Sequence, residues 1–288
     1  MRNLYLKLLF YLKASRPGLW FPTIWLYLLP TAGMDVENSF VFWVGLFYVS
    51  FPLNFLVYGW NDIVDEDIDR YNPRKDTYLF GAKGKHDELK SLPRAMITVQ
   101  LFIWPLLVYL SSWYVLWVCL GTVFFCWIYN AREWGLRSKP PLELLCQVGY
   151  LLVLPLSCIL NEQPIPDWRV WIYLILFCMQ SQLIGEVMDI VPDRKGGRRT
   201  TGTELGKGNT KLLIIGIVMS ESILVWYWFS ELYFALGLLG FVGWLCLDRF
   251  VLYKNREYSM MELYLFGYGS NVIALASMFY VWNTKVFM

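Results

Sequence analysis

The chain has 288 residues, of which 57% are apolar and 17% are charged, with a formal net charge of +2. A soluble globule of this size needs more polar side chains to cover its surface. The composition therefore excludes an ordinary water-soluble domain and is typical of a protein whose surface faces lipid. Membrane lipids are the expected surroundings, and a net charge this close to zero predicts no nucleic-acid partner.

Hydropathy marks nine apolar segments along the chain. They run roughly over 18–32, 40–60, 95–110, 113–129, 142–160, 170–188, 212–229, 232–247 and 263–282. Several approach the ~20 residues that a helix needs to cross a bilayer. Because lipid offers the backbone no hydrogen-bonding partners, each segment is expected to be a helix. The sequence thus predicts an all-α membrane protein.

The positions of Lys and Arg test this topology independently, because these residues collect in cytoplasmic loops. If all nine segments span the bilayer, 23 of the 25 lysines and arginines fall on one side, and only Arg169 and Lys285 fall on the other. This asymmetry predicts nine transmembrane helices and a cytoplasmic N-terminus. The whole chain, 1–288, is then one transmembrane domain with a cytoplasmic segment at 1–17 and cytoplasmic cap loops at 61–94 and 189–211.

The two longest polar stretches begin with carboxylates in the same spacing, i, i+3 and i+7. The residues in this spacing are Asp62, Asp65 and Asp69 in the first stretch and Glu186, Asp189 and Asp193 in the second. On a helix these positions fall within about 60° of one another, so each stretch projects its carboxylates from one face. Asp67 points the other way. The repetition indicates two pseudo-repeats, each with an acidic motif at the cytoplasmic end of a helix.

Converging carboxylates repel one another and are costly at a membrane boundary unless a cation joins them. Oxygen ligands with no nearby His or Cys favour a hard cation, and Mg²⁺ typically binds carboxylates, water and substrate phosphates. Two such motifs that face each other would hold a diphosphate through bridging Mg²⁺ ions. The basic residues after each motif would bind the remaining phosphate oxygens. A solvated charged loop is the alternative, but it does not require the same spacing twice.

The first motif, Asn61 to Asp69, reads NDxxDxxxD, and the second, Asp189 to Asp193, reads DxxxD. At these residues the sequence resembles the UbiA superfamily of intramembrane prenyltransferases, and the resemblance covers nearly the whole chain. It implies nine helices in a ring around a central cavity, with Mg²⁺ at the cytoplasmic cap. The sequence departs from the family pattern at Glu186, where many relatives carry Asp, so whether Glu186 contacts the metal directly stays an open question. Residues 72–75 and 196–201 are most similar to the carotenoid elongases.

The motifs and the resemblance together give four groups of candidate residues. The predicted catalytic residues are Asp62, Asp65, Asp69, Asp189 and Asp193, and the predicted metal ligands are these five with Glu186. The predicted diphosphate-binding residues are Arg16, Asn61, Arg74, Lys75, Lys139, Arg194, Lys195 and Arg198. The predicted cavity residues are Asn54, Tyr58, Gln182, Glu221 and Asn271. Glu221 is interpreted either as the base that removes a proton from the final cation or as a protonated helix contact.

These observations predict a Mg²⁺-dependent enzyme that ionises a prenyl diphosphate and transfers the prenyl group to a lipophilic acceptor, with a carotenoid-type polyene as one candidate. A terpene cyclase on the same scaffold stays open as an alternative, because the ionisation motifs are common to both. The internal repeat makes a transporter a third hypothesis. A CDP-alcohol phosphotransferase is disfavoured, since its single DGxxAR-type motif is missing from the sequence.

Overall fold

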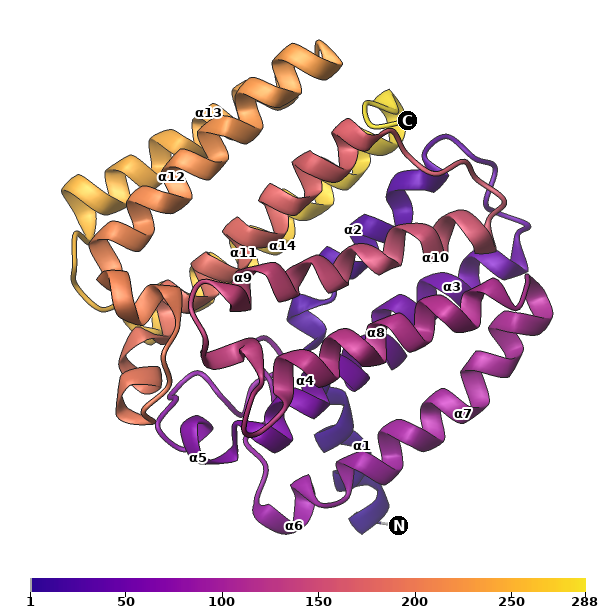
Figure 1. The fold of residues 1–288 in the computed structure, drawn as a ribbon, viewed down its shortest axis with the longest axis horizontal. Coiled ribbons are helices and arrows are strands. Elements are labelled where there is room, and N and C mark those ends of the chain that lie inside the picture. Colours follow the sequence, from indigo (N-terminus) through magenta and orange to yellow (C-terminus); the bar gives the residue numbers. More distant parts are fainter. Residues whose placement is uncertain (1) are drawn as a thin grey trace.

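The computed structural model describes residues 2–288, which fold into helices joined by loops (Figure 1). The helices of the first half are α1 (Arg2–Ala14), η1 (Pro17–Leu19), α2 (Phe21–Leu28), η2 (Leu29–Thr31), α3 (Phe40–Ser50), α4 (Pro52–Val64), α5 (Glu66–Asp69), α6 (His86–Leu89), α7 (Leu92–Leu110) and α8 (Tyr114–Asn130). Those of the second half are η3 (Leu136–Ser138), α9 (Leu142–Cys146), η4 (Gln147–Leu152), α10 (Val153–Leu160), α11 (Trp168–Lys195), α12 (Thr201–Phe229), α13 (Leu232–Leu247), η5 (Asp248–Leu252) and α14 (Met260–Thr284).

Within the described residues, seven helical rods are long and apolar enough to cross a membrane. Several of them combine consecutive helices, such as Phe40–Val64, which joins α3 and α4, and Leu142–Leu160, which joins α9, η4 and α10. Large apolar side chains point outward from these rods. Leu275 and Phe279 on α14, for example, are 65% and 75% exposed. Such an apolar outer surface is stable in lipid rather than in water, so the chain is a multi-pass membrane protein.

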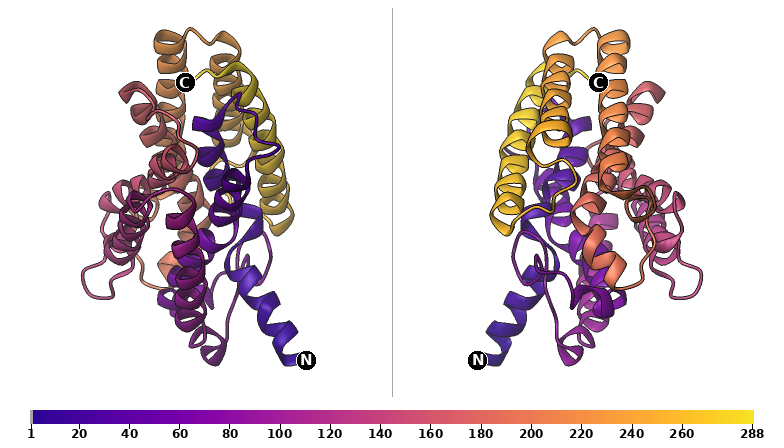
Figure 2. Two further views of the ribbon diagram at one scale, coloured as in Figure 1. Left: turned by 90° about the vertical axis from the view of Figure 1, so that its right-hand side faces the viewer. Right: turned by 90° about the vertical axis from the view of Figure 1, so that its left-hand side faces the viewer.

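The prediction of an all-α membrane protein is confirmed for the part of the chain that the structure describes, and each of the nine predicted segments lies on helix. Two of these segments are short. The segment 18–32 contains α2, with eight residues, between two 3₁₀ turns, and the segment 113–129 corresponds to α8, with 17 residues. It therefore stays a prediction that nine helices cross the membrane, that the fold contains two pseudo-repeats and that the N-terminus is cytoplasmic. The two chain ends lie at opposite ends of the molecule (Figure 2).

Local sequence explains where helices near the acidic motifs begin and bend. The side chain of Thr200 accepts a hydrogen bond from the Thr203 N–H and so caps α12. Gly206 has a φ of 74°, a left-handed conformation that suits glycine, and it separates the first turn of α12 from the long rod. Pro52 stands at the joint of α3 and α4 and leaves a carbonyl of α3 without its helical N–H partner.

The packing of the helices brings the ends of α4 and α11 to one end of the bundle. In Figure 1, α11 and α14 cross the middle of the molecule, α12 and α13 pair on one side of them, and α7 and α8 lie on the other side. α11 packs against α12 and η4, and α14 packs against α2. The largest apolar core includes Tyr27, Phe42 and Tyr173 and joins α2, α3 and α11. The acidic ends of α4 and α11 therefore close an apolar bundle.

Candidate active site

The two acidic motifs, far apart in sequence, meet at one cavity of about 470 Å³. Asp65 and Asp69 line it from the end of α4 and from α5, and Asp189 and Asp193 line it from the end of α11. Asp62 lies just behind this wall and is 1% exposed. The remaining walls are largely apolar. One end of the cavity is therefore strongly charged and the rest suits a hydrocarbon chain.

Basic side chains connect the motifs to each other. Arg198, from the loop before α12, places Nη1 3.2 Å from Oδ2 of Asp65 and 3.9 Å from Oδ1 of Asp193. Arg74, from the loop after the first motif, forms an ion pair with Asp189 of the second motif. The neighbouring Asn72 donates to the same Asp189 carboxylate over 2.9 Å. Each motif is thus held by residues that follow the other motif or stand near it.

The first motif also has cationic partners of its own. Oδ1 of Asp62 accepts from Arg16 Nη2 and from Lys75 Nζ, each over 2.6 Å, and Lys75 Nζ also lies 2.7 Å from Oδ2 of Asp69. Burial by itself would lower the pKa of Arg16, but the neighbouring acidic groups, of which Asp62 is the strongest, together outweigh burial and raise the pKa. Burial raises the pKa of Asp69, against the opposing charge of Lys75. Arg16 and Lys75 thus neutralise the buried carboxylates of Asp62 and Asp69.

Several buried polar atoms at this end of the cavity lack a hydrogen-bond partner. They are Oδ2 of Asp62 and the Nε atoms of Arg16 and Arg74. An unpaired buried polar atom is costly, so its persistence points to a partner that binds there. An unpaired carboxylate oxygen beside unpaired guanidinium N–H groups calls for a ligand with both cationic and anionic parts. Among the described residues, no three acidic, His or Cys side chains already converge as a metal cluster, because cations contact the carboxylates.

The structure separates the predicted basic residues into two sets. Arg16, Arg74, Lys75 and Arg198 line the cavity. Arg194 and Lys195 are exposed, and Arg194 donates to the Thr203 carbonyl over 2.8 Å. Lys139 is also exposed and donates to the Trp134 carbonyl over 2.8 Å.

Arg137, which the sequence analysis did not single out, reaches the site where Lys139 does not. It forms an ion pair with Asp65. The 3₁₀ turn Leu136–Ser138 sets this orientation, because residues on so tight a turn point in different directions. The position of Arg137 within a short basic loop was the only sequence signal.

Glu186 lines the cavity, yet both of its carboxylate oxygens are already bonded within the protein. Oε2 accepts from the Gly202 N–H over 2.7 Å, and Oε1 accepts from Gln182 Nε2 over 3.0 Å. A second carboxylate, Glu143 on α9, accepts from the Thr201 N–H over 2.6 Å and is fully buried. Both acids therefore bind the N-terminus of α12, where unpaired N–H groups and the helix dipole favour negative charge.

Three of the five predicted cavity residues do not line this cavity. Asn54 donates to Thr23 Oγ1 over 2.8 Å and to carbonyls at the joint of α3 and α4, where Pro52 disturbs the backbone pairing. Asn271 donates to the Gly18 carbonyl over 2.8 Å and so fastens α14 to η1. Glu221 is fully buried between helices, and neither of its oxygens has a hydrogen-bond partner.

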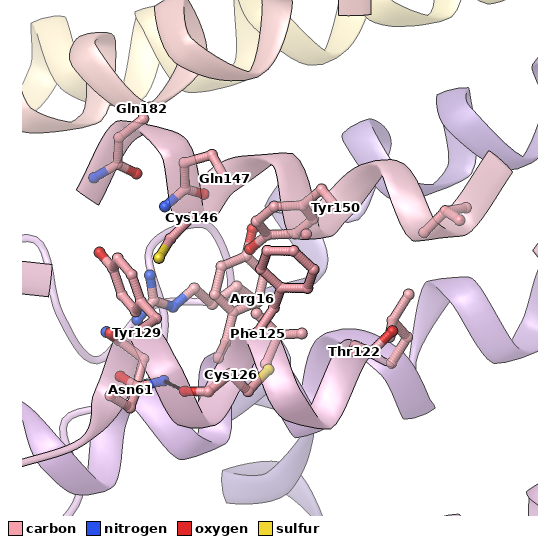
Figure 3. A pocket seen from close by; sticks show the side chains of 16 residues that line it. Arg16, Asn61, Thr122, Phe125, Cys126, Tyr129, Cys146, Gln147, Tyr150 and Gln182 are labelled. Atoms are coloured by element: carbon pink, nitrogen blue, oxygen red, sulfur yellow. Dashed lines mark hydrogen bonds between the residues drawn. The ribbon is translucent and has the colours of Figure 1, made fainter. Parts of the chain in front are cut away.

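The other two predicted cavity residues, Tyr58 and Gln182, stand where a second cavity meets the first. This cavity of about 150 Å³ lies between α4, α8 and the α9–η4 segment (Figure 3). We call the part that both cavities share the junction. Its residues are Arg16, Tyr58, Asn61, Tyr129, Gln147, Tyr150 and Gln182. We call the smaller cavity the short chamber and the larger one the long chamber. The charged end thus leads to two cavities whose walls are mostly apolar only beyond the charged end and the junction.

The fold and the paired acidic motifs define a family, which comparison with known proteins confirms. Residues 19–281 match the model of the UbiA prenyltransferase family, so the chain belongs to this family. The structure of a UbiA homolog from Archaeoglobus fulgidus bound to GPP and Mg²⁺ has a TM-score of 0.69 at 14% identity, over 96% of this chain and 99% of that one. The complex of the same homolog with DMAPP and Mg²⁺ has a TM-score of 0.68.

Curated relatives narrow the resemblance to one branch. A lycopene elongase/hydratase from Corynebacterium glutamicum is 26% identical over 217 residues, 74% of this chain and 75% of that protein. A lycopene elongase/hydratase from Haloferax volcanii is 28% identical over 207 residues, 66% of this chain and 64% of that protein. The resemblance to the carotenoid elongases that residues 72–75 and 196–201 indicated is thereby confirmed.

Proposed function

We propose that this protein is a Mg²⁺-dependent prenyltransferase that ionises a prenyl diphosphate and transfers the prenyl group to a lipophilic acceptor. The observation that carries the proposal is the meeting of two acidic motifs and their basic partners at the charged end of an otherwise apolar cavity. A diphosphate needs cations around it, and a prenyl chain needs apolar walls. This cavity supplies both within one bundle of membrane helices.

The donor set at the charged end fits Mg²⁺, because it consists of carboxylate oxygens and includes the unpaired Oδ2 of Asp62. The residues that would hold the metal are Asp62, Asp65, Asp69, Asp189 and Asp193. When bound, Mg²⁺ neutralises charge on the departing diphosphate. Glu186 supports this set indirectly, since its bond to the Gly202 N–H fixes the start of α12 and with it the loop that carries Arg198.

The diphosphate oxygens are bound by Arg16, Arg74, Lys75, Arg137 and Arg198, with Asn61 beside them. Each of these cations contacts a carboxylate of the acidic motifs, which places it within reach of a diphosphate that the same carboxylates bind through Mg²⁺. The planar guanidinium of Arg198 is placed to bind two oxygens at once. Basic residues from both motif loops then stabilise the negative charge that develops on the leaving group.

The junction surrounds the allylic carbon with aromatic rings. Tyr58 lies one helical turn inside Asp62, and Tyr129 and Tyr150 face the same space from α8 and η4 (Figure 3). The guanidinium of Arg16 lies 4.5 Å from the centre of the Tyr58 ring and covers one of its faces. The rings of Tyr129 and Tyr150 are therefore better placed to stabilise a carbocation. The position of the junction inside the bundle keeps water from the cation.

The acceptor in this proposal is a carotenoid-type polyene, and the active site faces the cytoplasm. The first part rests on the relatives, which are named lycopene elongase/hydratases. The second part rests on the charge distribution, since the loops that build the site carry most of the Lys and Arg residues. The polyene is apolar along its whole length, and the walls of the long chamber match that property.

Removal of the metal tests the first half of the proposal. With purified protein and a prenyl diphosphate, a chelator should lower pyrophosphate release by about 100-fold or more, and excess Mg²⁺ should restore it. The physical reason is that the carboxylates repel the diphosphate until a cation joins them. Pyrophosphate release that continues at the same rate in the presence of the chelator would contradict the proposed dependence on Mg²⁺.

An assay without acceptor tests the second half. Membranes that contain the protein are incubated with Mg²⁺ and farnesyl or geranylgeranyl diphosphate, and the organic products are identified. Formation of cyclic hydrocarbons or alcohols would mean that the protein is a terpene cyclase and not a prenyltransferase. No enzyme-dependent pyrophosphate with any donor or polyene would favour a transporter. Prenylated polyene, formed only when a polyene is added, is the expected result.

Substitution of the two basic residues in the loop 135–140 should reduce prenyl transfer to very different extents. Arg137→Ala removes an ion pair with buried Asp65 and a phosphate ligand. A charge-assisted hydrogen bond of this kind contributes about 1.5–3 kcal/mol, so transfer should fall by about 10- to 100-fold. Lys139→Ala is the matched control, because Lys139 is exposed and bonds only the Trp134 carbonyl. Equal losses in both variants, measured as kcat/KM for the donor, would contradict the assignment.

A further inference from the structure

The first helix, α1, extends away from the rest of the bundle toward the N-terminus (Figure 2). It has 13 residues, fewer than the ~20 that a helix needs to cross a bilayer. Its last turns pack against the bundle. The hydroxyl of Tyr11 donates to Ser91 Oγ over 3.1 Å, and the Tyr11 ring lies 5.4 Å from the ring of Phe55 on α4. The protein therefore holds α1 by its C-terminal half.

The side of α1 that faces away from the bundle is apolar. Tyr5, Leu8, Leu9 and Leu12 recur at i, i+3, i+4 and i+7 and so share one face of the helix, which we call the apolar stripe. Tyr5 and Leu8 are 62% and 56% exposed. Ala14, which is fully buried against the bundle, lies on the opposite side of the helix. Apolar side chains exposed in a row mark a surface that binds a partner.

The charge of α1 identifies that partner. The helix contains three basic residues, Arg2, Lys7 and Lys13, and no acidic residue. Lys7 is exposed and stands on the side opposite the apolar stripe. A basic helix with one apolar face is typical of helices that lie in the plane of a membrane surface, where anionic head groups attract Lys and Arg. A second copy of the chain would bring the same positive charge and be repelled.

The C-terminal end of α1 leads directly into the active site. Nζ of Lys13 lies 2.9 Å from Oδ1 of Asp76, the residue that follows Lys75. Arg16, two residues after the helix, forms an ion pair with Asp62 over 2.6 Å. The backbone between them is hydrogen-bonded without a gap, since the Arg16 N–H donates to the Lys13 carbonyl over 2.9 Å. A change in the tilt of α1 would therefore displace Arg16.

We infer that α1 lies in the membrane surface on the side of the acidic motifs, with the apolar stripe turned to the acyl chains and its positive charge at the level of anionic lipid head groups. This position is independent of the reaction. Its consequence for the reaction rests on the proposed function: the lipid surface holds α1, and through it Arg16, in the orientation that binds the diphosphate. Loss of the lipid contact should weaken binding of the donor more than it slows the chemical step.

The depth of two neighbouring residues tests the position of α1. The full-length protein is placed in lipid nanodiscs that contain anionic phospholipid, and a spin label is attached to Leu8→Cys or to Lys7→Cys, with the unsubstituted protein as the background for its native cysteines. The two side chains differ in direction by about 100°. The Leu8 label should collide more often with oxygen, which dissolves in lipid, and the Lys7 label more often with a water-soluble nickel chelate. A Leu8 label in water would overturn the inference, and a Leu8 label shielded from both reagents would replace the lipid surface by a second copy of the chain.

Donor kinetics in the same nanodiscs test the connection to Arg16. Leu8→Gln makes the apolar stripe more polar and should raise the KM of the prenyl diphosphate at least about threefold, with kcat within about twofold. Lys7→Gln, the same replacement at the next residue, should leave the KM unchanged in neutral lipid and reduce only its response to anionic lipid. An unchanged KM in Leu8→Gln would overturn the connection. If no variant releases pyrophosphate, the proposed function fails, while the label depths still decide where α1 lies.

Discussion

Asp65→Asn should reduce pyrophosphate release by about 10³-fold and leave the fold intact. Asp65 is 2% exposed and gathers Arg137, Arg198 and Asn61 around one carboxylate. The amide keeps the shape but loses the charge that binds a cation, and the lost electrostatic stabilisation of about 4 kcal/mol corresponds to about 10³-fold in rate. The measurement is single-turnover release of pyrophosphate from the prenyl diphosphate at saturating Mg²⁺, with thermal unfolding in detergent as the check on folding.

Asp67→Asn is the matched control for this prediction. Asp67 belongs to the same motif, two residues away, but its side chain is 90% exposed and only approaches Arg70 at 3.8 Å. A surface pair of this kind contributes little, so activity should stay within about twofold of the wild type. Similar losses at both positions would mean that the motif acts through overall negative charge. The proposed binding of one metal-bound diphosphate by specific carboxylates would then be wrong.

The placement of the acidic motifs follows from the sequence because it depends on local geometry. The i, i+3 and i+7 spacing puts three carboxylates on one face of a helix, and this holds for the second motif, which lies wholly on α11. It does not hold for the first motif, because α4 ends at Val64 and Asp69 lies on the separate helix α5. The one-sided distribution of Lys and Arg adds that both motif-bearing ends lie on the same side of the membrane. The shared side of the membrane is therefore what predicts that Asp65 and Asp193 approach a common ligand. In the structure the two are connected through the single guanidinium of Arg198.

The residues that sequence reasoning misplaced are those whose role depends on tertiary partners. Glu186 has the spacing of a metal ligand, but the N–H that it binds belongs to Gly202, and no pattern within α11 indicates that bond. Glu143 carries no motif and is recognisable only beside the N-terminus of α12. The choice between Arg137 and Lys139 depends on one 3₁₀ turn. Side-chain direction in loops and at helix ends is set by such packing, which hydropathy and spacing do not encode.

The sequence also predicts some residues of the cavity wall but not the shape of the cavity. Tyr58 and Gln182 could be placed at the cavity wall, because each lies one turn inside an acidic residue on a helix of known direction. The wall of the short chamber depends on the contact between Gly149 and Phe125, residues of different helices with no shared motif. Asn54 occupies a similar position on α4, yet Pro52 frees nearby carbonyls that bind its amide. Polarity alone therefore did not distinguish a cavity residue from a helix contact.

Arg198→Lys should lower kcat by about 100-fold and raise the KM of the donor, although it retains the positive charge. Arg198 contacts Asp65 of the first motif and Asp193 of the second, and it also donates to the Tyr129 hydroxyl over 3.0 Å. Lysine is a point charge that cannot make these planar contacts at once. Loss of one preorganised donor to a developing oxyanion costs about 10²- to 10³-fold in kcat. Steady-state kinetics with the prenyl diphosphate measures both parameters.

Arg199→Lys, at the next position, separates this effect from a general change in the loop. Arg199 is exposed and pairs with Glu204 on the surface over 2.7 Å, a bond that contributes little to stability. The two substitutions are chemically identical and adjacent, so any difference between them arises from the direction in which each side chain points. A loss of kcat confined to Arg198→Lys would place the guanidinium on the diphosphate. Equal kcat in both variants would restrict Arg198 to a structural connection between the acidic motifs, and Arg16, Arg74, Lys75 and Arg137 would then be the basic residues that stabilise the departing diphosphate.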